Sequence, residues 1–171
     1  AAPAPALTVG EHAFMANYPG DPSGSFPPGF AELTLTVARA STSVALQTGP
    51  SPSAVGGDVT MTAKVSVSSP GSGSPTGTVT FSEGSTELGT GTLDGSGEAT
   101  FSTSALLPGV REITARYDGD AHFTPGQTEE PIAQEVWRGA SSTTLTADPT
   151  PSQYGQPVTL TVDGKANAAV A

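Results

Sequence analysis

The sequence contains the stretch Ala16-Asn17-Tyr18-Pro19-Gly20-Asp21 and repeats it, 99 residues later, as Ala115-Arg116-Tyr117-Asp118-Gly119-Asp120. The same offset aligns further residues on both sides: Ala6-Leu7 with Ala105-Leu106, Gly10 with Gly109, Val37 with Val136, Leu46 with Leu145, and Val59 with Val158. A repeat of this length predicts one small domain that is used more than once.

With this repeat, the 171 residues divide into three parts. Residues 41–138 form the complete unit. Residues 1–40 correspond to the C-terminal strands of a partial unit, and residues 139–171 to the N-terminal strands of a further partial unit. The chain therefore starts and stops within a repeat unit. This pattern indicates either a segment of a longer array of units or a protein whose incomplete units are completed by strands of a neighbouring molecule.

Composition narrows the possible functions. Charged residues make up 13% of the chain, the net charge is −10 and the six basic residues are scattered, so a nucleic-acid partner is not expected. The absence of cysteine excludes disulfides and thiolate metal sites, so the fold depends on its apolar core. No apolar run is long enough to span a bilayer. The N-terminal run Ala1–Ala6 lacks an initiator Met and a signal-peptide pattern, as expected of a processed or excised chain.

Apolar and polar residues alternate most clearly over Val59–Val67, as expected of a strand with one buried face. Further strands are predicted at 43–47, 76–82, 86–93, 98–103, 110–117 and 132–137, separated by Gly, Pro, Asp and Ser. About seven strands in roughly 100 residues are typical of a β-sandwich. The predicted interior comprises Leu46, Val59, Met61, Ala63, Val65, Val79, Phe81, Leu88, Leu93, Ala99, Phe101, Leu106, Ile113, Ala115, Tyr117, Ile132 and Val136.

Three connections have distinct sequences. The run Asp94-Gly95-Ser96-Gly97 predicts a tight hairpin, because its glycines can take positive φ. The run Pro70-Gly71-Ser72-Gly73-Ser74-Pro75 predicts an exposed, flexible loop. The unit boundaries near 38–40 and 138–140 leave almost no linker, so successive units should join stiffly and form an extended rod.

Three runs of the complete unit form a recognisable pattern: Thr76-Gly77-Thr78-Val79-Thr80-Phe81, Glu98-Ala99-Thr100-Phe101 and the run from Ala105 to Asp120. Together they resemble the bacterial Ig-like repeat domains of large surface proteins, and the resemblance covers about Ser41 to Val136. It implies an all-β, immunoglobulin-like β-sandwich. It also implies a secreted or cell-surface location and a role as spacer, stalk or adhesive module.

The resemblance also assigns structural roles. Tyr117 is similar to the tyrosine corner of Ig-type sandwiches, whose ring packs in the core while its hydroxyl bonds nearby backbone, and Tyr18 repeats it. Gly109 and Gly119 belong to the matching motifs around the strand that ends at Tyr117.

Asp118 and Asp120 are the candidate metal ligands, because carboxylate oxygens suit Ca²⁺, with Glu112, Glu129 and Glu130 nearby in the sequence. The alternative is a turn in which Asp bonds its own backbone. His12 and His122 lack the partners of a metal site and are expected in exposed turns, and Trp137 is expected to pack between units.

The sequence shows no catalytic set, so we expect no enzyme and no cofactor other than the candidate Ca²⁺. The leading hypothesis is a non-catalytic structural or spacer module of a tandem-repeat protein. Its partners would be neighbouring Ig-like units, or identical subunits joined head to tail by strand donation. The competing hypothesis is a ligand-binding module of an adhesin or of a phage decoration or tail protein, with a cell-surface glycan or receptor as partner.

Overall fold

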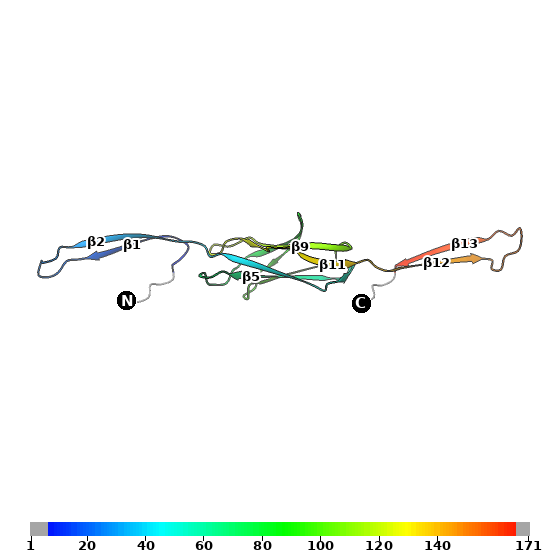
Figure 1. Cartoon of the computed structure of the whole chain (residues 1–171), viewed down its shortest axis with the longest axis horizontal. Helices are drawn as coiled ribbons and strands as arrows, with labels where there is room; N and C mark the ends of the chain where they lie inside the picture. Colours follow the sequence, from blue (N-terminus) through cyan, green and yellow to red (C-terminus); the bar gives the residue numbers. More distant parts are fainter. Residues whose placement is uncertain (1–6, 167–171) are drawn as a thin grey trace.

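The computed structural model describes residues 7–166, which form a central two-sheet sandwich with one β-hairpin on each side (Figure 1). The far ends of the two predicted partial units, residues 1–6 and 167–171, lie outside the described residues. The three parts follow one another along the long axis of the molecule. Residues 7–166 contain no helix that is long and apolar enough to cross a membrane.

Two antiparallel sheets form the sandwich and confirm the predicted immunoglobulin-like class. The first has the strand order β3 (Thr42–Gly49), β5 (Val59–Val67), β8 (Glu98–Thr103). The second has the order β4 (Ser53–Ala54), β11 (Ile132–Trp137), β9 (Gly109–Tyr117), β6 (Thr78–Glu83), β7 (Thr86–Thr92), with β10 (Gly126–Gln127) also paired to β9. Only the contact between β4 and β11 is parallel among these pairs.

The interior lies between the two sheets and is made of alternate residues of each strand. Its buried apolar residues are Val44, Leu46, Val59, Met61, Ala63, Val65, Val79, Phe81, Ala99, Leu106, Ile113, Ala115, Tyr117, Phe123 and Val136. Four predicted core residues, Leu88, Leu93, Phe101 and Ile132, are half-buried and pack against this cluster. Val44 and Phe123 are core residues that the sequence prediction missed.

The predicted hairpin at Asp94–Gly97 is wrong. Strands β7 and β8, on either side of this run, belong to different sheets, so the run is a corner between the two layers. Asp94 holds the corner, because its Oδ1 accepts hydrogen bonds from the backbone N–H groups of Ser96 and Glu98 at 2.8 and 2.9 Å. Gly97 has φ +79°, whereas Gly95 has no positive φ.

The flanking hairpins keep the strand registers of the sandwich. In the N-terminal hairpin, β1 (Gly10–Tyr18) pairs with β2 (Gly29–Val37), and Gly10 opposite Val37 matches Gly109 opposite Val136 in the sandwich. In the C-terminal hairpin, β12 (Ser141–Asp148) pairs with β13 (Thr159–Ala166). There Ser141 opposite Ala166 matches Thr42 opposite Val67. Each hairpin therefore repeats a known pair of sandwich strands, shifted by 99 residues.

Candidate functional site

The end of β9 and the turn after it, residues 117–124, hold most of the residues singled out in the sequence. The Tyr117 ring is fully buried, and its hydroxyl donates to the Thr76 carbonyl oxygen at 2.7 Å. Thr76 lies 41 residues upstream in the loop before β6, so this bond joins two distant segments, unlike the local bond of a tyrosine corner. Burial raises the pKa of Tyr117, and the nearby Asp120 carboxylate raises it further.

Asp120 joins the same two segments through its carboxylate. Its Oδ2 accepts hydrogen bonds from the backbone N–H of Thr76 at 3.0 Å and from the Thr76 hydroxyl at 2.8 Å. Its Oδ1 accepts from the backbone N–H groups of His122 and Phe123 at 2.8 and 2.9 Å. Burial favours the neutral acid, but the bonds from His122, Thr76 and Phe123 together outweigh it and lower the pKa of Asp120 to about 2.

Gly119 is required by the path of this turn. It has φ +82°, and a Cβ there would lie 2.8 Å from the backbone nitrogen of Pro125 and 2.9 Å from the carbonyl oxygen of Phe123. Gly109, at the start of β9, has φ +120°. Its backbone lies against the Arg111 side chain, which donates to the carbonyl oxygens of Leu107 and Pro108.

The same turn anchors the segment that joins the N-terminal hairpin to the sandwich. The Ala40 N–H donates to the His122 carbonyl oxygen at 2.8 Å, and the Thr124 N–H donates to the Ala40 carbonyl oxygen at 2.9 Å. Arg39 adds a bond from its Nη1 to the Asp120 carbonyl oxygen at 3.3 Å. The junction is therefore bonded to the sandwich directly after β2 ends.

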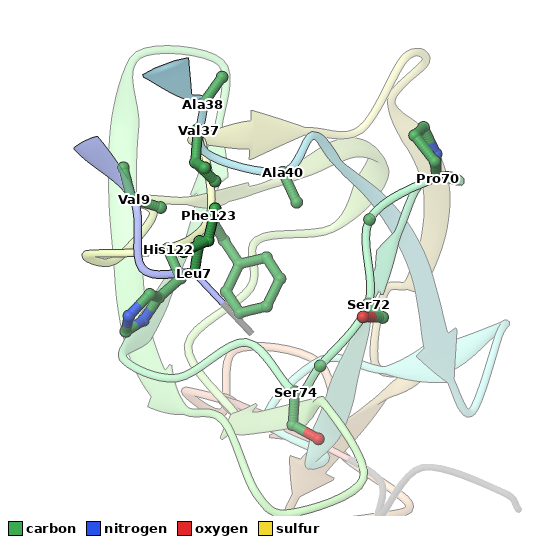
Figure 2. Close-up of a pocket in the computed structure, with 12 residues that line it drawn as sticks. Leu7, Val9, Val37, Ala38, Ala40, Pro70, Ser72, Ser74, His122 and Phe123 are labelled. Carbon is green, nitrogen blue, oxygen red and sulfur yellow. The ribbon is translucent and has the colours of Figure 1, made fainter. Parts of the chain in front are cut away.

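A cleft of about 440 Å³ lies beside this junction (Figure 2). One side is lined by hairpin and linker residues, and the other by the loop 70–74 with His122 and Phe123; the hairpin and linker residues are Leu7, Val9, Val37, Ala38 and Ala40. The loop packs closely here, because a Cβ on Gly71 would lie 2.6 Å from the Ala40 Cβ. The predicted exposed loop thus also faces the junction, and Pro75 at its end is buried.

The N-terminal hairpin repeats some of the contacts made around this turn and the start of β9. Asp21, the equivalent of Asp120, accepts hydrogen bonds from the backbone N–H groups of Ser23 and Phe26 at 3.2 and 2.5 Å. The Ser23 hydroxyl and these N–H groups lower the pKa of Asp21. His12, the equivalent of Arg111, bonds through Nε2 to the Thr8 carbonyl oxygen at 2.7 Å. The bonds of Ser23 to Asp21 and of His12 to Thr8 have equivalents in the sandwich, whereas the Phe26 bond has none, because its equivalent residue is Pro125.

The candidate calcium ligands have protein partners. Asp118 pairs with Arg116 at 3.4 Å, and both Asp120 oxygens accept hydrogen bonds within the turn. Glu112, Glu129 and Glu130 are exposed. Within residues 7–166, no group of three or more acidic, His or Cys side chains has the spacing of a metal site. Calcium binding at Asp118 and Asp120 stays a prediction.

Of the remaining candidates, His122 lies in its expected setting, whereas His12 and Trp137 do not. His122 lies in an exposed turn, but His12 lies within β1 and is half-buried. The expected packing of Trp137 between units is wrong, because its side chain is 57% exposed and its indole N–H donates to Glu135 at 2.9 Å.

Thr76 is the main residue of this site that sequence reasoning missed. It accepts the Tyr117 bond and donates both of its own hydrogens to Asp120. The only signal in the sequence was its position directly before the Gly-Thr-Val-Thr-Phe run that carries the family resemblance.

The comparisons with known proteins agree with this fold. The search of curated proteins found no match. A family model, the bacterial Ig-like domain (group 3), matches residues 45–136, which include seven of the sandwich strands in full and most of β3 and β11. The match covers more than half of the chain and contains the turn built around Tyr117 and Asp120. The chain therefore belongs to the bacterial Ig-like domain family, group 3.

Proposed function

We propose that this chain is a non-catalytic spacer from a secreted or surface protein with tandem Ig-like units, in which successive units form a stalk or filament that supports adhesion. Its immediate partners are the neighbouring Ig-like units. Ig-like domains of this family are generally non-catalytic and extracellular, which supports the class of function and the location.

The observation that carries the proposal is the bonded junction. A flexible linker would let adjacent units bend freely, whereas Ala40 is tied to both His122 and Thr124 in a short parallel bridge. Arg39 adds a hydrogen bond to the Asp120 carbonyl oxygen, and Gly71 of the cleft-lining loop packs closely on Ala40. A junction held by these contacts fixes the orientation of one unit relative to the next, as a stalk requires.

Distance measurements between spin labels test the stiffness of the junction. The chain has no native cysteine, so Glu32→Cys on β2 and Glu87→Cys on β7 give two exposed labelling sites. We expect one narrow distance distribution. A control chain with Gly-Gly-Ser inserted between Ala38 and Arg39 should give a broad one. A broad distribution in the uninserted chain would contradict a stiff spacer.

The competing function, a glycan- or receptor-binding module, makes a different prediction. A bound ligand raises the melting temperature by mass action, whereas a spacer gains nothing from a panel of free sugars. Phe123, the aromatic residue of the junction cleft, is only 5% exposed and offers little of its ring for stacking. A sugar that raises the melting temperature, with the effect lost in Phe123→Leu, would favour the binding module.

Calcium binding is tested in the same way. If Asp118 and Asp120 hold Ca²⁺, the ion should raise the melting temperature of the unchanged chain but not of the Asp118→Asn, Asp120→Asn double variant. Equal melting with and without Ca²⁺ in the unchanged chain would overturn the calcium prediction and leave the spacer proposal intact.

A further inference from the structure

Strand β3 has an open edge within the complete sandwich. It is the outermost strand of its sheet and pairs with β5. The Ser68 N–H donates to the Ser41 carbonyl oxygen at 2.9 Å, which fixes the phase of this ladder. Because bonded residues alternate in an antiparallel pair, Val44, Leu46 and Thr48 direct their backbone N–H and C=O groups away from β5. Within residues 7–166, no strand pairs with these groups, which we call the β3 edge.

The segment just before β3 shows that this side of the chain can bond a partner strand. Ala40 has the same phase as Val44, and both its N–H and its C=O bond to the segment 122–124 in a parallel bridge. The chain then turns away, and β10 pairs with β9 instead. The β3 edge therefore continues a line of backbone groups that already accepts a strand at its start.

The other edge strands of the sandwich are protected. On the outer side of β8, the Asp94 N–H donates to the Glu98 carbonyl oxygen at 2.8 Å. Strand β7 has an irregular register with β6 between Phe81 and Ser82. Charges, prolines and bulges are the usual protection of an exposed edge against strand addition. The eight residues of β3, Thr42–Gly49, include no charged residue and no proline.

A groove beside the β3 edge indicates which kind of strand fits there. It has a volume of about 320 Å³ and is lined by Thr42, Ser43, Val44, Ala45, Gln127 and Glu129. Glu129 is the charged residue of this lining, and the next residue, Glu130, is also exposed. The whole chain carries a net charge of −10. A cationic partner strand is therefore attracted to the groove, whereas a second copy of this acidic chain is repelled.

We propose that the β3 edge binds an extended, basic peptide segment of another protein by β-strand addition. Backbone hydrogen bonds to Val44, Leu46 and Thr48 supply affinity, and Glu129 favours Lys or Arg on the bound strand. Every residue of this site belongs to the complete unit. The inference goes beyond the spacer function and does not depend on it, because the β3 edge lies on the sandwich itself and not at the junction.

A nuclear magnetic resonance titration of the 171-residue chain tests the proposal. The probe is an end-blocked peptide of about seven residues, the length of a typical strand, in which lysine and valine alternate. A one-residue shift lets such a peptide turn its lysines to either side. We expect saturable shifts of the backbone amide signals of Val44, Leu46 and Thr48, and several-fold weaker binding of a peptide with glutamate in place of lysine. Shifts centred on another strand, or none with either peptide at millimolar concentration, would overturn the proposal.

Two variants separate the backbone contact from the charge. Thr48→Pro removes one outward N–H but no bond to β5, so it should keep its melting temperature and lose peptide binding. Glu129→Lys should weaken binding of the lysine peptide several-fold and strengthen that of the glutamate peptide. The matched control is Glu87→Lys, the same charge change on exposed β7, which should alter neither.

Two results of these measurements would contradict the peptide site. One is lysine-peptide binding that is unchanged in both Thr48→Pro and Glu129→Lys. The other is a set of concentration-dependent shifts at Val44, Leu46 and Thr48 in the absence of peptide, which would assign the β3 edge to a second copy of the chain.

Discussion

Tyr117 and Asp120 each join the turn after β9 to the loop before β6 through a single side chain. Both bond to Thr76, one to its carbonyl oxygen and the other to its N–H and hydroxyl. All polar atoms of Thr76 are therefore used, so removing either partner leaves part of this residue without its bond.

Replacing Tyr117 with Phe should lower the free energy of unfolding by about 1–3 kcal/mol, because the Thr76 carbonyl loses its donor while the buried ring is kept. Urea denaturation followed by circular dichroism measures the change. Tyr18→Phe is the matched control: Tyr18 occupies the equivalent position but is 48% exposed, and we expect little change. Equal losses in the two variants would show that the hydroxyl bond to Thr76 is unimportant.

Asp120 should make the fold sensitive to acid. Its pKa is about 2 in the folded chain, below the ordinary value of 3.8, so ionised Asp120 stabilises the fold. This contribution is complete above about pH 4 and is lost as the pH falls toward 2. We expect the melting temperature to drop across this range.

The acid-induced drop should be smaller in Asp120→Asn, which cannot titrate and should melt lower at neutral pH. Asp118→Asn is the control, because Asp118 makes only an exposed ion pair with Arg116 and should leave the acid profile unchanged. An unaltered drop in Asp120→Asn would rule out Asp120 as its source. Asp21 and Asp94 also have lowered pKa values and contribute in the same direction.

At the scale of the elements, the glycines of strand β7 allow the two sheets of the sandwich to lie close to each other. A Cβ on Gly89 would lie 2.3–2.9 Å from three carbons of the Phe101 ring. That ring stacks on Phe81 at a centroid distance of 6.0 Å, so it has little room to move away. A glycine within a strand marks such a close approach.

Gly89→Ala should therefore destabilise the sandwich by about 1–3 kcal/mol through overpacking. Phe101→Leu in the same chain should restore part of this loss, because the smaller side chain makes space for the new methyl group. Thermal melts of the single and double variants measure the coupling. Gly95→Ala, with nothing within 4 Å and no positive φ, is the control. Additive effects at Gly89 and Phe101 would contradict the contact.

The strands were largely predictable from the sequence, and their sheet assignment was not. The alternation of apolar and polar residues predicted strands β8 (98–103) and β11 (132–137) with the bounds that the structure shows. This was possible because the two-residue period of a half-buried strand is a local property of the sequence. Strands β4 and β10 have two residues each, too few to show a period. The wrong hairpin at 94–97 has a related cause: Gly and Asp indicate a turn, but not whether the next strand joins the same sheet.

The site was predictable only in part, for a similar reason. Tyr117, Gly119 and Asp120 were visible because the repeat and the family pattern mark them. Thr76 and Ala40 were not, because each meets the turn across a sequence separation that no local pattern records. Phe123 was missed as a core residue because it lies in a turn and not in an alternating strand.

At the scale of the whole molecule, stiff junctions and in-line units define the proposed spacer. The sandwich and both hairpins follow one long axis in Figure 1. Each hairpin has strands of eight or nine residues, which extend for roughly 30 Å at about 3.3 Å per residue. The three parts together should therefore behave as a rod on the order of 100 Å long.

Small-angle X-ray scattering of the 171-residue chain, extrapolated to zero concentration to remove any association, tests the spacer account most directly. A rod of this length predicts a radius of gyration on the order of 30 Å and a largest dimension on the order of 100 Å. A compact chain of the same length would have a radius of gyration of about 16 Å. The extended value would agree with a stalk of in-line units, and the compact value would contradict it.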